Sequence, residues 1–101
     1  MFNRILSGLE DIAHSVKTGD GTNTEAAIRA TRVSIKDYVQ AGTARPEGAT
    51  LADGTVAPLK RLDSELATWQ TKLPVILNEP VGRQGIAKHA KYWIDELNKL
   101  T

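Results

Sequence analysis

The fold of this chain follows from residues 58–73, PLKRLDSELATWQTKL. The large apolar side chains of this segment recur at spacings of three, four, three and four residues: Leu59, Leu62, Leu66, Trp69 and Leu73. Because an α-helix turns about every 3.6 residues, this rhythm places all of them on one stripe. A stripe of this kind must be covered by other elements, and we interpret the rest of the chain as that cover.

Length, composition and charge narrow the range of proteins that this chain can be. Its 101 residues are 41% hydrophobic and include no cysteine, which predicts a single helical domain over residues 1–101 without disulfides or a thiolate metal site. Thirteen basic and twelve acidic residues nearly cancel, so bulk charge does not call for nucleic acid or an anionic membrane. No segment approaches the roughly 20 apolar residues of a membrane span. We expect a cytoplasmic protein that has no membrane partner and no cofactor.

Three further segments have the period of an amphipathic helix, so the predicted fold is all-α, a small four-helix bundle of antiparallel type. Residues 2–16 place apolar side chains at intervals of three and four. Residues 22–41 have an apolar face, with the row Arg29, Arg32 and Lys36 on the far side. Residues 85–100 repeat the rhythm of residues 58–73. Each of these last two stripes has a tryptophan at its middle, and we expect both tryptophans in one core.

Capping and proline rules set the expected ends of the helices. Thr22, with Glu25 three residues later, has the pattern of a capping box and predicts the start of the second helix. Pro58 suits a first helical turn, and Pro74 predicts that the third helix ends at Leu73. Residues 75–77 are then interpreted as a buried connector.

Residues 42–57 have no helical periodicity, and we expect a long ordered loop there, between helices two and three. Two interpretations stay open. Asp53-Gly54 is a favoured tight-turn dipeptide, which allows a small hairpin over residues 49–57. The simpler interpretation is a loop that crosses one end of the bundle, with Leu51 and Val56 directed inward.

His14 is the best single candidate for chemistry, because it lies opposite the apolar stripe of its helix and is expected at the surface. The string AHSVKTGDGT, residues 13–22, resembles the phosphohistidine motif of histidine phosphotransfer domains, especially the chemotaxis-kinase type. The resemblance implies that His14 accepts a phosphoryl group and that Lys17, one turn later, stabilises its charge. The match covers about ten residues, and Thr18 stands where that family has its first glycine.

Two other groups of residues have simpler explanations. Glu10, Asp11 and His14 are neighbours that could form half of a metal site, but a charged helix face accounts for them, and no metal is expected. Residues 81–86, VGRQGI, are similar to the Gly-x-x-Gly clamp of KH domains, which implies RNA contact near Arg83. Two glycines before a helix are more often part of a turn.

The lack of a catalytic motif favours a non-enzymatic protein-interaction module: an adaptor, a regulator or an inhibitor. It would act through helix faces and the 42–57 loop. The predicted partner-binding residues are Arg29, Arg32, Val33, Lys36, Leu51 and Asp53. The expected partner is another protein, and a second copy of the chain would give a homodimer. Two alternatives stay open: phosphotransfer through His14 and Lys17, and weak, salt-sensitive nucleic-acid binding through the basic row or Arg83.

Overall fold

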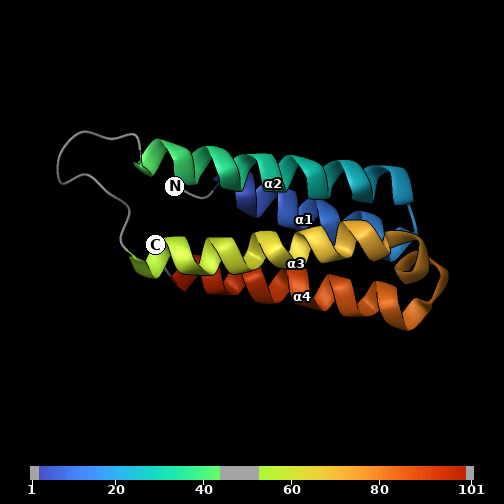
Figure 1. The fold of residues 1–101 in the computed structure, drawn as a ribbon. Helices are drawn as coiled ribbons and strands as arrows, with labels where there is room; N and C mark the ends of the chain where they lie inside the picture. Colours follow the sequence, from blue (N-terminus) through green and yellow to red (C-terminus); the bar gives the residue numbers. More distant parts are fainter. Residues whose placement is uncertain (1–2, 44–52, 100–101) are drawn as a thin grey trace.

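The computed structural model describes residues 3–43 and 53–99, which form four helices and no strand. These are α1 (Asn3–Thr18), α2 (Gly21–Thr43), α3 (Asp53–Asn78) and α4 (Pro80–Lys99). The helices run alternately in opposite directions, and each packs against two neighbours, with α4 beside α1 (Figure 1). The predicted all-α four-helix bundle is confirmed. Of the predicted long loop, residues 44–52 lie outside the described residues.

The predicted apolar stripes form the core. All five large apolar residues of the α3 stripe are buried, with Leu59, Leu62 and Leu66 fully inaccessible to solvent. The other helices contribute the remaining members of the same cluster: Ile5, Leu9, Ile12, Val16, Ile28, Ile35, Ile86, Ala87, Trp93 and Leu97. Trp69 and Trp93 therefore lie in one core, as predicted.

The turn between α1 and α2 is built from residues 15–24. Gly19 has a φ of 75° and donates its N–H to Val16 O at 3.2 Å, while Asp20 N–H donates to Ser15 O at 3.0 Å. These two bonds form a Schellman motif, which satisfies the last carbonyls of α1. Asp20 then caps α2, because its Oδ1 accepts the backbone N–H of Asn23 at 3.1 Å. The predicted capping box at Thr22 is wrong, since the helix begins earlier, on a carboxylate.

Close packing joins α1 to α2 at Gly8. A Cβ added at Gly8 would overlap Thr31 Oγ1 and lie 3.1 Å from Thr31 Cβ. Thr31 is itself fully buried, and its hydroxyl donates to Ala27 O at 2.7 Å. Glycine at position 8 therefore sets the distance between the two helices.

α3 is longer than predicted at both ends. It begins at Asp53 and includes Pro58 and Pro74 in its interior. The alternative of a hairpin over residues 49–57 is contradicted at residues 53–57, which are helical, while residues 49–52 lie outside the described residues. The predicted end at Leu73 and the placement of Pro58 in the first turn are wrong as well. A proline leaves the carbonyl four residues earlier without its helical donor. Continuation beyond Pro74 brings Ile76 and Leu77 against the core, and this burial opposes that loss.

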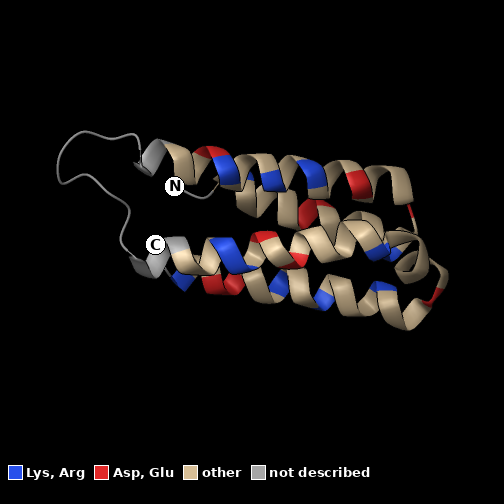
Figure 2. Ribbon diagram, viewed as in Figure 1, with Lys and Arg blue, Asp and Glu red and all other residues tan. Residues whose placement is uncertain are grey.

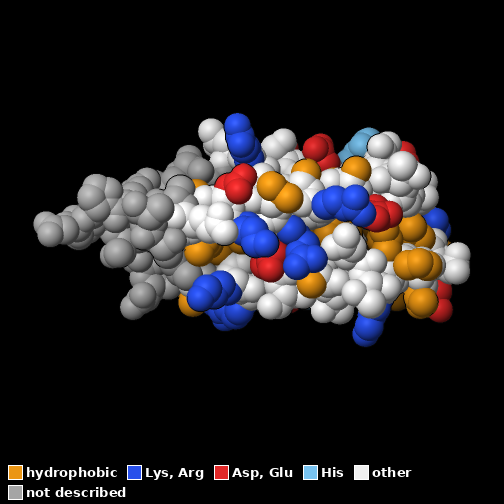
Figure 3. Space-filling model, turned by 45° about the horizontal axis from the view of Figure 1, so that its top comes forward, with side chains coloured by type: hydrophobic (Ala, Val, Ile, Leu, Met, Phe, Trp, Pro, Cys, Tyr) orange, Lys and Arg blue, Asp and Glu red, His pale blue; other side chains and the backbone are white. Residues whose placement is uncertain are grey.

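Only Glu79 separates α3 from α4. Its carbonyl accepts Arg83 N–H at 3.1 Å, and Pro80 occupies the first position of α4, where a missing N–H costs nothing. The prediction that the last helix begins near residue 85 is therefore wrong. The predicted buried connector is also wrong, because Val75 is 67% exposed. Hydrophobic side chains gather at this end of the molecule (Figure 3).

Candidate functional site

Arg32 joins α2 to α3. Its Nε donates to Asp63 Oδ1 at 3.0 Å, and its Nη1 donates to Gln70 Oε1 at 3.0 Å. Asp63 and Gln70 lie two turns apart on α3, so the guanidinium spans that distance along the helix. The side chains of Arg32 and Asp63 are 38% and 39% exposed. The prediction that Arg32 points to the solvated far side of α2 is wrong, because the side chain is held against α3.

Arg32 also lines a shallow pocket between α2 and α3 with a volume of about 280 Å³. The pocket residues are here called the α2–α3 basic surface: Arg29, Arg32, Val33, Lys36 and Gln70. Val33 is 54% exposed, so an apolar side chain stands among long polar ones. On this face, basic side chains lie beside acidic and hydrophobic ones (Figure 3). Four of the six predicted partner-binding residues are therefore brought together.

The charges of the α2–α3 basic surface are partly neutralised. Arg29 Nη2 lies 2.7 Å from Glu25 Oε1 one turn earlier, and both side chains are exposed. Arg32 is paired with Asp63, whereas Lys36 forms no ion pair with another described residue. Over the described helices, charges of both signs are interspersed (Figure 2). The surface therefore has a local positive charge and belongs to no long basic stripe.

The remaining predicted partner-binding residues are not placed at this surface. Leu51 lies outside the described residues. Asp53 is the first residue of α3, and its side chain is not described. The contribution of the 42–57 loop stays a prediction.

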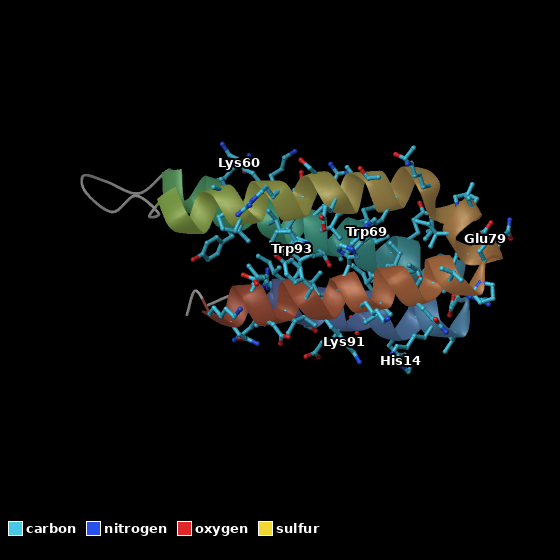
Figure 4. All side chains as sticks on the ribbon, turned by 90° about the horizontal axis from the view of Figure 1, so that it is seen from below. His14, Lys60, Trp69, Glu79, Lys91 and Trp93 are labelled. Carbon is cyan, nitrogen blue, oxygen red and sulfur yellow. The ribbon has the colours of Figure 1, made fainter. Side chains whose placement is uncertain are left out.

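His14 lies on the exposed face of α1, as predicted, at the outer edge that α1 shares with α4 (Figure 4). Lys17 follows in the last turn of the same helix and is also exposed. Glu10 and Asp11 are exposed on α1 as well. Within residues 3–43 and 53–99, no three His, Cys, Asp or Glu side chains are arranged to hold a metal ion.

The Gly-x-x-Gly segment is part of α4. Residues 82–85 are helical, so the prediction of a turn before the helix is wrong. Gly82 is required by packing, because an added Cβ would lie 2.9 Å from Ile76 O of α3. Arg83 reaches the end of α1, where its Nη1 lies 3.0 Å from the position that a Gly19 Cβ would occupy.

A polar and aromatic groove between α3 and α4 was not foreseen from the sequence. Trp93 Nε1 donates a hydrogen bond to Glu65 Oε2, and His89 Nδ1 lies 4.0 Å from the same oxygen. The Tyr92 ring stands edge-on to those of His89 and Trp93, and it lines a pocket of about 370 Å³ with Glu65 and Trp93. Glu65 and Trp93 are 28 residues apart. The sequence did contain a partial signal for this contact, because Glu65 lies beside the apolar stripe of α3 and Trp93 lies within that of α4.

None of the helices in the described part of the chain combines the length and the apolar composition needed to cross a membrane. The expected cytoplasmic location stays a prediction. No protein-family model, no curated protein and no solved structure matches the chain.

Proposed function

We propose that this chain is a non-enzymatic protein-interaction module, an adaptor, regulator or inhibitor, whose partner docks on the α2–α3 basic surface. The supporting observation is the convergence of Arg29, Arg32, Val33 and Lys36 around one pocket. An exposed apolar side chain surrounded by long polar side chains suits a small interface. Apolar contact at its centre contributes affinity, and the surrounding charges orient the partner.

The partner that fits this surface is an acidic segment of another protein that also carries an apolar side chain. Arg32 is already held by Asp63 and Gln70, so partner binding costs little conformational entropy at this side chain. Lys36 has no carboxylate partner among the described residues. The exposed Arg29–Glu25 pair is worth about 0.3–0.5 kcal/mol and can be exchanged for a contact with the partner.

Val33→Asp is expected to weaken partner binding about tenfold or more, because it places a carboxylate at the centre of a surface that receives acidic and apolar groups. Val75→Asp is the matched control, since Val75 is also an exposed valine but lies at the α3–α4 end of the bundle. The partner is captured with the tagged chain from a nuclease-treated lysate, identified by mass spectrometry and then titrated against the purified variants.

Two results would count against this proposal. Equal losses for Val33→Asp and Val75→Asp would show that the change acts through general charge, and unchanged binding in Val33→Asp would remove the surface from the interface. If the captured material disappears after nuclease treatment and in added salt, the result would instead support weak nucleic-acid binding.

A second candidate function is phosphotransfer through His14. The observation that favours it is the surface position of His14, with exposed Lys17 one turn later. An imidazole nitrogen would bond to the donor phosphorus while the leaving group departs, and Lys17 would stabilise the negative charge. Incubation with a small phosphodonor should give acid-labile phosphate on the wild type and on His89→Gln, but not on His14→Gln. Equal labelling of His14→Gln would end this candidate.

A further inference from the structure

Another pocket lies between α1 and α4, on the side of the bundle opposite the α2–α3 basic surface. It has a volume of about 200 Å³. This pocket is here called the α1–α4 lysine pocket. It is lined by Lys17 from α1 and by four residues that span about two turns on one face of α4: Gln84, Ala87, Lys88 and Lys91. Lys91 lies on the outer edge of the bundle, as does His14 (Figure 4). The sequence gives no hint of this pairing, because Lys17 is far from the α4 residues in the chain.

The three lysines of this pocket lack the carboxylate partners that three other basic residues of the described chain have. Elsewhere, Arg29 is paired with Glu25, Arg32 with Asp63 and Lys99 with Glu96. No ion pair joins Lys17, Lys88 or Lys91 to any described residue. Lys91 and Asp95 are four residues apart on α4, but they form no ion pair. The α1–α4 lysine pocket is therefore a concentration of uncompensated positive charge.

The shape and the donors of the pocket restrict what it can bind. Ala87 is 3% exposed, so the pocket floor is formed by a small side chain that leaves room for an entering group. The Gln84 amide adds N–H donors to three ammonium groups, and Arg83 stands one residue before it. A volume of about 200 Å³ is below that of typical drug-sized sites, which favours a small, highly charged group.

We propose that the α1–α4 lysine pocket binds the phosphate group of a small phosphorylated molecule. Lysine ammonium groups act on phosphate as point charges, and three lysines that line one pocket from two helices supply positive charge to match a phosphate or diphosphate. The pocket does not depend on partner docking at the α2–α3 basic surface. Nor does it require His14 as a nucleophile, because His14 does not line it.

The test is a titration of the full-length ¹⁵N-labelled chain with pyrophosphate, followed by NMR at low and at high NaCl concentration. The largest amide shifts are expected at Lys17 and over residues 84–91. Lys88→Met with Lys91→Met should weaken binding about tenfold, and added salt should weaken it in the wild type. Methionine keeps the aliphatic stem, so the double variant should keep the wild-type spectrum. Lys88→Met alone should give an intermediate loss.

The matched control is the double variant Lys60→Met with Lys72→Met, which removes two exposed charges from α3. It should bind pyrophosphate as the wild type does. An equal loss in this control, or shifts spread evenly over all lysines, would overturn the proposal, because binding would then follow net charge alone.

Two further arms separate the sources of the phosphate and the role of His14. ATP is titrated beside pyrophosphate, and similar losses for both in the α4 double variant support recognition of the phosphate group. ATP binding that survives this change would overturn the assignment, because the base would then hold the ligand. His14→Gln should still bind pyrophosphate even where phosphoryl labelling is lost. Binding that disappears in His14→Gln would place the site on His14 rather than on the lysines.

Discussion

Leu66→Ala is expected to lower the free energy of unfolding by about 2–5 kcal/mol. Leu66 is fully buried at the middle of the α3 stripe and belongs to the single core cluster that all four helices share. Truncation removes buried apolar surface and leaves a cavity that rigid neighbouring helices fill only in part. For a domain of this size, stability is small enough that the change removes a large fraction of it. Chemical denaturation followed by circular dichroism measures the loss.

Val81→Ala is the control for the Leu66 experiment. Val81 is 78% exposed, so its truncation should change the free energy of unfolding by no more than about 0.5 kcal/mol. A Leu66→Ala variant as stable as the wild type would mean that the α3 stripe is not packed inside the bundle.

Gly8→Ala is expected to destabilise the fold by about 1–3 kcal/mol, against the usual preference of helices for alanine. In a free helix this change would stabilise by about 1 kcal/mol. Here the new methyl group would overlap the Thr31 hydroxyl and press on Thr31 Cβ, whose side chain is buried and bonded to Ala27 O. Either the hydroxyl leaves its acceptor or α1 moves away from α2, and both responses reduce stability. Thermal unfolding measures the change in Tm.

Gly85→Ala provides a control of opposite sign. Gly85 is inside α4, and an added Cβ would meet nothing within 4 Å. The substitution should therefore raise stability by up to about 1 kcal/mol. Combining Gly8→Ala with Thr31→Ala should recover part of the loss, because it removes the hydroxyl that the methyl group overlaps. A stabilising effect of Gly8→Ala would contradict the close approach of α1 and α2.

The sequence predicted the helices through their apolar periodicity, and it failed at their ends. Apolar periodicity indicates which side chains are buried, and the five apolar residues that the spacing selected within residues 59–73 are all buried. Local proline rules then placed a helix end at Leu73, whereas α3 continues to Asn78. The cause is tertiary packing, because Ile76 and Leu77 pack against the core cluster. Local sequence rules do not include the free energy of this burial.

The candidate sites were predictable only in part, for a related reason. The row Arg29, Arg32 and Lys36 is visible in the sequence because its members share one helix face. Its real environment depends on Asp63 and Gln70, which are 31 and 38 residues from Arg32. The α1–α4 lysine pocket depends on the pairing of the first and last helices. Such pairings follow from the packing of the bundle and leave no mark in a local pattern.

The two proposed surfaces can be tested independently, because they lie on opposite sides of the ring of helices. Charge changes at Lys36 should affect partner docking and leave pyrophosphate binding unchanged. Changes at Lys88 and Lys91 should do the reverse. Variants of one surface therefore serve as controls for the other, because they keep the same fold and carry the same kind of charge change.

The most direct test of the proposed function is a photo-crosslinking amino acid at position 33, activated in lysate from the natural source and read by mass spectrometry. We expect an adduct with one partner protein that is lost when Lys36→Glu is added and retained with Lys91→Glu. A crosslinker at position 75 should not give this adduct. The same adduct from both positions, or an adduct between two copies of this chain that ignores Lys36→Glu, would contradict docking of a partner on the α2–α3 basic surface.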